Sequence, residues 1–406
     1  MRIFTGIVPA LAAVVAVAAV VGDGRAQDAF APQIAEAVPR VEAALGLHFK
    51  RPVRYEVRDR AEMRRMLAKL LDAERSAREL AAEQTVYHLL GIIPDTLDWP
   101  RLQLDLLAEQ VVGFYDPRSK VLYLQNDPDD PTLSIVIPHE LVHALQDQYM
   151  DLDSLVSLKG DDDRVLAAMA VMEGQATLVS FEIALGMGAD FPGSEEAIRL
   201  SVRSGMEEQP VIAAAPHFVR ELEIFPYLSG MEFMLRFQRE RPGALPFGSD
   251  LPTSTAQIEH VALYFGPSRK EPLALSLPAP RGAELVYEND FGAFATRVFL
   301  EQLLRDRKRA ARATAGWAGD RYALVRTASG DGLVWLTVCD TPRDAAEFAE
   351  AMRRASAKRY RDARSEAGRT VTVTRVEIAG RPAVLYEDLP PGTLSDVLDL
   401  ALVRAH

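Results

Sequence analysis

The feature that most constrains this chain is a pair of histidines four residues apart, in the stretch His139-Glu140-Leu141-Val142-His143. On an α-helix, residues four apart lie about 40° apart around the axis and about 6 Å apart along it. Both imidazoles can therefore reach one ion from the same face. Glu140 points to the side of that ion, where it can hold a water molecule without being a ligand. The stretch predicts a helix that carries two metal ligands and a general base.

A third ligand is expected from a second helix, at about residues 162–186. Its apolar positions are too many for a surface helix, so we expect it to be largely buried. Glu173 lies in its middle, and a buried glutamate needs a partner, because Glu is almost never fully buried alone. The chain between His143 and Glu173 is long enough to turn back and bring the two helices together. We predict that Glu173 binds the same ion; a structural salt bridge is the alternative.

The segment around the histidine helix has two further features. Residues 111–115 and 120–125 read as strands of a β-hairpin joined by turn residues 116–119. An extended peptide could pair with the outer edge of this hairpin, since an exposed strand offers a row of backbone donors and acceptors. A purely structural hairpin is the alternative. Pro138 should kink the helix just before His139, unless two short helices meet there.

Together these residues resemble the gluzincins, the thermolysin-like zinc metallopeptidases, in which two helices supply His, His and Glu to zinc and an edge strand receives the substrate. The resemblance covers about residues 110–265. The chain is also similar to a poorly characterised group of bacterial proteins through four ordered motifs, which are His139-Glu140-Leu141-x-His143-Ala144-Leu145-Gln146-Asp147-Gln148, Glu173-Gly174-x-Ala176-Thr177, Phe225-Pro226-Tyr227-x-x-Gly230 and Ser254-Thr255-x-Gln257.

The resemblance implies one zinc ion per chain, held by His139, His143 and Glu173 with a fourth position open to water. Glu140 would accept the proton of that water and later pass it to the leaving amine, as general base and then acid. Two histidines and a carboxylate suit zinc, although nickel, cobalt and iron accept the same ligand types.

Other roles are less constrained by the sequence. Related enzymes stabilise the oxyanion of the tetrahedral intermediate with a downstream His or Tyr, which makes Tyr227 and His260 candidates here. An ordinary packing role is the alternative for each. Where many gluzincins carry an Asp four residues after the ligand Glu to orient a histidine, this chain has Thr177. Asp147 and Glu182 are the candidates for that orienting role.

Composition and the N-terminal sequence limit the possible partners and the location of the protein. The net charge of −12 argues against a nucleic-acid surface, and the single cysteine, Cys339, excludes an intramolecular disulfide and a thiolate metal cluster. Residues 1–26 have the pattern of a signal peptide, with Arg2, an apolar core at 7–21 and small residues before an expected cleavage after Ala26. An uncleaved membrane anchor is the alternative. We therefore expect a periplasmic or extracellular location, with no membrane contact after cleavage.

The expected fold class is α+β. We predict a mainly helical, zincin-like metallopeptidase domain with a small sheet at 27–280, and a smaller α+β domain at 281–406, after a Pro-rich loop. That second domain should end in a helix at 393–403, and its partner is unknown. The predicted function is an exported zinc metallopeptidase, an endopeptidase acting on peptide or protein substrates. The alternative is a catalytically silent binding or scaffolding protein that keeps the metallopeptidase fold.

Overall fold

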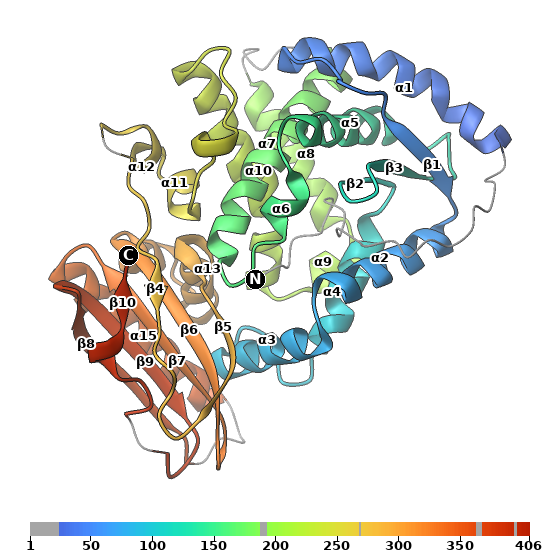
Figure 1. The fold of residues 1–406 in the computed structure, drawn as a ribbon. Coiled ribbons are helices and arrows are strands. Elements are labelled where there is room, and N and C mark those ends of the chain that lie inside the picture. Colours follow the sequence, from blue (N-terminus) through green and yellow to red (C-terminus); the bar gives the residue numbers. More distant parts are fainter. Residues whose placement is uncertain (1–23, 187–192, 268, 363–367, 394–395) are drawn as a thin grey trace.

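The computed structural model describes residues 24–186, 193–267, 269–362, 368–393 and 396–406, so nearly all of the predicted signal peptide lies outside the described residues (Figure 1). The fold is α+β, as predicted. The first part of the chain contains α1 (Gly24–Leu45), β1 (Arg54–Arg58), α2 (Arg60–Glu74), α3 (Ala77–Leu90), α4 (Trp99–Gln110), β2 (Gly113–Asp116), β3 (Val121–Gln125), α5 (Leu133–Tyr149), α6 (Leu152–Val156), α7 (Asp162–Leu185), α8 (Ser194–Glu207), α9 (Pro210–Ala214), α10 (His217–Glu240), the 3-10 turn η1 (Gly248–Asp250), α11 (Thr255–Glu259) and α12 (Val261–Phe265).

The remaining part forms a large sheet with helices. Its elements are β4 (Leu275–Ser276), β5 (Glu284–Asn289), α13 (Gly292–Leu304), α14 (Arg307–Thr314), β6 (Trp317–Thr327), β7 (Gly330–Cys339), α15 (Pro342–Asp362), β8 (Thr370–Ile378), β9 (Arg381–Leu389), the 3-10 turn η2 (Leu400–Leu402) and β10 (Arg404–Ala405).

Helices α7 and α10 form the centre of the first part, and they cross at two glycines. A Cβ atom on Gly174 would lie 2.1 Å from the backbone carbon of Gly230, and one on Gly230 would lie 1.9 Å from the carbonyl oxygen of Ala170. Only residues without a side chain allow two helix backbones to come this close. Helix α5 packs against the same central helix, α7. The two helices that carry the candidate ligands are therefore direct neighbours.

A three-stranded sheet lies beside α5, in the order β1-β3-β2. Strands β2 and β3 form the predicted antiparallel hairpin, and β1 pairs with β3 in parallel. The parallel pairing joins strands far apart in the sequence, which is why the local pattern did not reveal it. Helix α1 covers α5 and buries Phe30, Ile34 and Val41 against it. Strand β2 is thus an edge of the sheet, next to the histidine helix.

The second part is a five-stranded antiparallel sheet in the order β5-β6-β7-β9-β8. Helices α13 and α15 pack on one face, whereas β4, β10 and the terminal segment lie on the other (Figure 1). The predicted helix at 393–403 is wrong for the described residues: turns and η2 stand there instead, and β10 follows. Val397 and Leu398 are buried against the sheet, and Ala405 pairs with Leu275 of β4, so tertiary contacts replace helical hydrogen bonds.

The two parts share one buried core across the expected boundary at 280/281. Phe225 of α10 stacks on Phe294 of α13 with ring centroids 3.9 Å apart, and the same hydrophobic cluster continues to Trp335 and Phe348. Thr255 links the parts as well, because its hydroxyl accepts from the backbone N–H of Phe294. Helix α13 therefore joins the C-terminal sheet to α7 and α10 of the first part.

Capping and burial define several helices of the first part. Helices α2 and α3 are separate, because Asp59 and Ser76 each begin one of them with a reciprocal capping box. Helix α5 is continuous, with Pro138 inside it, so the alternative of two short helices does not hold. Helix α7 is long and apolar enough to cross a membrane, but 89% of its most apolar window is buried in the protein, as in the core helix of a globular fold.

Candidate metal centre

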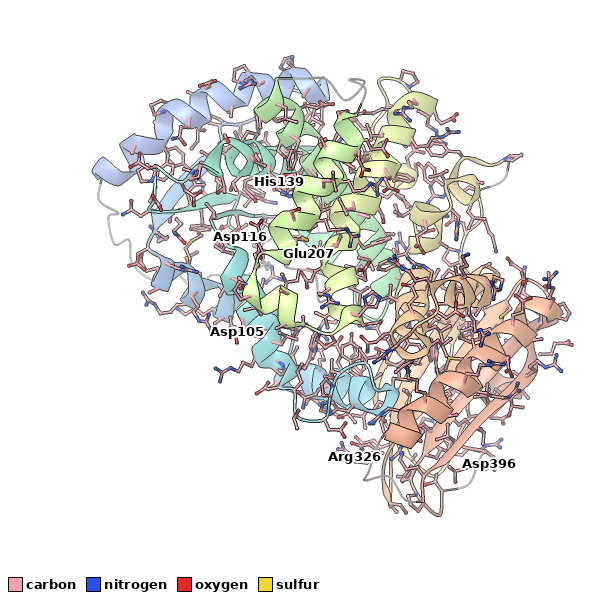
Figure 2. The ribbon with its side chains drawn as sticks, turned by 180° about the vertical axis from the view of Figure 1, so that it is seen from behind. Asp105, Asp116, His139, Glu207, Arg326 and Asp396 are labelled. Atoms are coloured by element: carbon pink, nitrogen blue, oxygen red, sulfur yellow. The ribbon has the colours of Figure 1, made fainter. Side chains whose placement is uncertain are left out.

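Helix α5 presents the two histidines and Glu140 in the protein interior. His139 is 5% exposed, His143 2% and Glu140 0%. Every residue of this helix from Ile137 to Asp147 is buried, since α1, β2 and α7 pack around it. In Figure 2, His139 lies among the helices of the first part, far from Arg326 on β6 and from Asp396 in the turn after β9.

Glu173 of α7 faces both histidines, as the sequence predicted. Its Oε2 lies 3.0 Å from Nε2 of His139, and its Oε1 lies 3.3 Å from Nε2 of His143. The two Nε2 atoms are 3.1 Å apart. Ligand atoms about 2.0–2.1 Å from a tetrahedral zinc ion are separated from one another by about 3.3 Å, so these three side chains are spaced as zinc ligands would be.

The carboxylate and the two imidazoles shift one another's pKa values. Burial lowers the pKa of His143, but Glu173, Glu140 and Gln146 together outweigh burial, and the pKa is raised to about 9. Burial raises the pKa of Glu173, and the two histidines outweigh this effect and lower it. Burial lowers the pKa of His139, with Glu173 opposing. The carboxylate therefore stays ionised, as a metal ligand must.

Glu140 has one engaged and one unengaged oxygen. Its Oε2 accepts a hydrogen bond of 2.8 Å from the backbone N–H of Tyr115 on β2. Its Oε1 is buried and has no hydrogen-bond partner in the part of the chain that the structure describes. Burial raises the pKa of Glu140 to about 8, although the nearby His143 lowers it. An orphaned carboxylate oxygen beside three converging ligand atoms fits a site that takes an ion and a polar ligand such as water.

The sequence suggested that Asp147 orients a histidine, but its hydrogen bonds go to Tyr115 and Lys120 instead. Its Oδ2 accepts from the hydroxyl of Tyr115 at 2.7 Å, and its Oδ1 accepts from Nζ of Lys120 at 2.8 Å. Tyr115 is thus bonded to α5 twice, once by its side chain and once by its N–H to Glu140. Asp147 fixes the β2–β3 hairpin against the helix.

The partner of His143 is Gln146, which the sequence reasoning missed. Oε1 of Gln146 lies 2.9 Å from Nδ1 of His143. Gln146 is fully buried and also bonds to Met172 and Gln175, which flank Glu173 on α7. The signal was available in the sequence, because a residue three positions after His143 lies on nearly the same helix face.

The structure brings Tyr227 to the site and leaves His260 outside it. The ring centroids of Tyr227 and His139 are 6.3 Å apart, and Tyr227 is 4% exposed. Burial raises the pKa of Tyr227 well above its usual value, with Glu173 adding to the effect, so the phenol keeps its proton. His260 is exposed where α11 meets α12, apart from the buried ligand group.

A buried carboxyl on α10 was also missed by the sequence analysis. Glu223 lies one helical turn before Tyr227 and is 1% exposed. Neither of its oxygens has a hydrogen-bond partner within the described ranges, and burial raises its pKa well above the usual value. We therefore describe Glu223 as a neutral acid in the core. The sequence does not single out Glu223, because the same helix also contains Glu221, Glu232 and Glu240.

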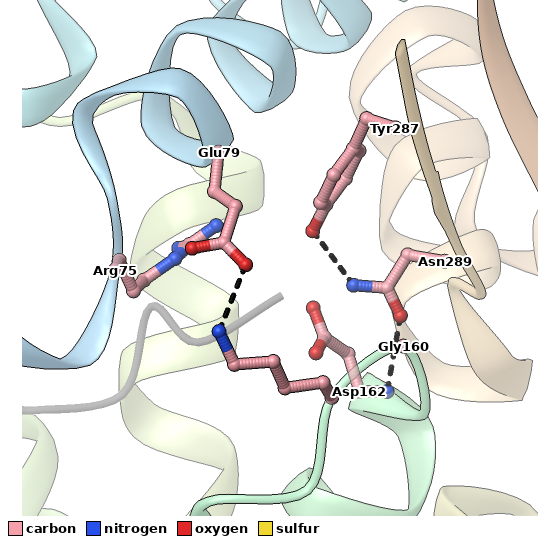
Figure 3. Close-up of a pocket in the computed structure, with 7 residues that line it drawn as sticks. Arg75, Glu79, Gly160, Asp162, Tyr287 and Asn289 are labelled. Carbon is pink, nitrogen blue, oxygen red and sulfur yellow. Dashed lines mark hydrogen bonds and ion pairs between the residues drawn. The ribbon is translucent and has the colours of Figure 1, made fainter. Parts of the chain in front are cut away.

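A small polar cavity lies elsewhere, where α2 and α3 meet β5 (Figure 3). Its volume is about 30 Å³, which is room for one or two water molecules. Lys159 donates to Glu79 across it, and Asn289 donates to the hydroxyl of Tyr287 while accepting from the N–H of Asp162. The bond between Asp162 and Asn289 ties the two parts of the chain together, and the cavity is too small for a peptide.

Comparison with known proteins adds one match. A family model described as a domain of unknown function (DUF8575) matches residues 283–388, which contain the five-stranded sheet with α13–α15. No curated protein and no solved structure matches the chain. The match begins close to the expected boundary at 280/281 and does not include the candidate ligands.

Proposed function

We propose that this protein is a zinc-dependent metallopeptidase, with His139, His143 and Glu173 as the zinc ligands and Glu140 as the general base. One observation carries the proposal: the three ligand atoms lie within 4.8 Å of one another in the buried interior. The orphaned Oε1 of Glu140 supports it, because that atom needs a polar partner. The resemblance of the sequence motifs to the gluzincins points to the same chemistry.

The roles of the protein side chains follow from their contacts. A zinc ion, when bound, supplies Lewis acidity and lowers the pKa of a bound water towards about 7. The N–H of Tyr115 holds Oε2 of Glu140, which leaves Oε1 to accept a proton and to return it to the leaving amine. Tyr227 keeps its proton and is therefore suited to donate a hydrogen bond to an oxyanion.

The substrate we propose is an extended peptide or protein segment. Strand β2 is an edge of its sheet and lies directly against α5, so a peptide that pairs with β2 would pass beside Glu140. All four residues of β2 are buried, as are the ligands, so the surrounding segments must open to admit a substrate. Export to the periplasm or the exterior is proposed from residues 1–26 alone.

The second candidate function is a catalytically silent protein that binds a partner or acts as a scaffold. The burial of the site favours this second function, because Glu140 is 0% exposed and Tyr227 is 4% exposed, so a substrate has no open path to them. A site of this kind would hold zinc for structural stability and would not turn over a substrate. Both functions predict bound zinc, but only the first predicts hydrolysis of a peptide.

One experiment separates these functions. Purified full-length protein is analysed for metal and incubated with a peptide library, beside Glu140→Gln and the exposed control Glu36→Gln. We expect about one zinc per chain in all three proteins, and cleavage that falls about 10²- to 10⁴-fold in Glu140→Gln alone. Zinc without cleavage by the wild type would support the silent protein. A wild type that binds no zinc would exclude both functions.

A further inference from the structure

We infer that Gln146 is a positioning residue of the candidate metal centre. It sets which ring nitrogen of His143 faces the ion, and it ties together the two helices that carry the ligands. The inference rests on the proposed metal site and extends it to a residue that does not touch the ion.

Gln146 makes three hydrogen bonds with good distances in a fully buried position. Its Oε1 lies 2.9 Å from Nδ1 of His143 on its own helix. Its Nε2 donates to the backbone carbonyl of Met172 at 3.2 Å and to Oε1 of Gln175 at 2.9 Å, both on α7. Both amide hydrogens and the amide oxygen are therefore used.

These contacts determine how the amide is oriented. A backbone carbonyl can only accept hydrogen bonds, so the NH₂ group of Gln146 must face Met172. The amide oxygen then faces His143 and requires a hydrogen on its Nδ1. In the neutral imidazole this leaves Nε2 of His143 as a bare lone pair, aimed at Glu173 and His139. A flipped amide would place its oxygen against the Met172 carbonyl, which is repulsive.

The same side chain also sets the spacing between the ligand helices. Met172 and Gln175 lie on either side of Glu173, so the bonds of Gln146 hold the segment of α7 that presents the third ligand. The neighbouring acid Asp147 does not compete for this role, because Tyr115 and Lys120 already engage both of its oxygens.

The test compares Gln146→Met with Gln148→Met in the full-length chain. Methionine has a similar length and lacks the amide acceptor and donors. Gln148 is the matched control, since it lies on the same helix and bonds to the backbone of Arg51. Zinc and cobalt(II) affinities of chelator-treated protein are measured by competition with a chromophoric chelator. We expect about 10- to 100-fold weaker binding in Gln146→Met and no change in Gln148→Met.

A rescue variant and a metal-free readout complete the test. Gln146→Glu keeps an acceptor for Nδ1 but loses the donors to Met172 and Gln175, so its metal affinity should lie between that of Gln146→Met and that of the wild type. Proton NMR of metal-free, ¹⁵N-histidine-labelled protein should show a slowly exchanging Nδ1–H of His143 in the wild type and Gln148→Met, and not in Gln146→Met.

The outcomes separate the inference from the proposed function. Wild-type affinity and a protected Nδ1–H in folded Gln146→Met would overturn the inference, even if the protein is a zinc enzyme. A wild type with the protected proton but no metal affinity would overturn the proposed function, while the role of Gln146 in orienting the imidazole would stand.

Discussion

The close crossing of α7 and α10 gives the sharpest test of how this fold positions its candidate site. Gly174 directly follows the ligand Glu173, and Gly230 lies one helical turn after Tyr227. Replacing Gly174 with Ala adds one Cβ atom between two buried backbones. That atom would meet the carbon and oxygen of Gly230 at 2.1 and 2.4 Å, and the backbone N of Met231 at 2.5 Å.

The expected cost follows from these distances. Ordinary contacts of a Cβ atom lie at 3.4–4 Å, so the helices must separate by roughly 1 Å, because backbone atoms cannot rotate away. Overpacking a core costs about 1–3 kcal/mol, and a backbone clash belongs at or above the upper end. Alanine returns about 0.5–1 kcal/mol through its better helix propensity. We expect Gly174→Ala to lower the free energy of unfolding by about 2 kcal/mol or more.

Urea denaturation followed by circular dichroism measures this change, and Gly205→Ala is the matched control. Gly205 lies within α8, and a Cβ atom there would meet nothing within 4 Å. The control should therefore be more stable than the wild type by about 0.5–1 kcal/mol. If Gly174→Ala is as stable as the wild type, the helices do not cross as closely as described, and the account of how Tyr227 reaches Glu173 fails with it.

Two further predictions concern buried charge. Arg75→Met removes the partner of Glu83, whose carboxylate lies 2.8 Å from the guanidinium. We expect urea denaturation to show a free energy of unfolding lower by about 3–5 kcal/mol. Adding Glu83→Gln should recover much of that loss, whereas additive losses in the double variant would contradict the coupling. Burial raises the pKa of Asp163 well above its usual value, against hydrogen bonds from Thr255 that lower it. The protonated Asp163 carboxyl thus stabilises the fold fully below the unfolded pKa of about 3.9, and this contribution is lost as the pH rises through the pKa of the folded state. The free energy of unfolding of Asp163→Asn should therefore fall less between pH 5 and 8 than that of the wild type.

The sequence predicted those features of the site that depend on spacing within one helix or on one improbable residue. His139 and His143 lie on one face because they are four apart, and Glu173 was identifiable as a charge in a buried helix. Both inferences needed only local geometry and the cost of burying a charge. The structure brings all three side chains together.

Features that depend on contacts between distant segments could not be predicted in this way. Strand β1 pairs with β3 in parallel across α2 to α4, and no local pattern encodes that register. Gln146 acquires its role from Met172 and Gln175 on another helix. Residues 396–403 belong to a segment with a helical pattern but pack on a sheet, because burying Val397 and Leu398 outweighs local propensity.

A charge argument favours an amide over an acid as the partner of His143. If a zinc ion were bound as proposed, its two positive charges would balance the carboxylates of Glu173 and Glu140, although burial raises the pKa of Glu140 to about 8. An Asp at position 177, where Thr177 is 2% exposed, would add a buried charge with no counterion, which costs several kcal/mol. Gln146 supplies the acceptor that His143 needs without any charge. Asp147 lies close by and forms an ion pair with Lys120.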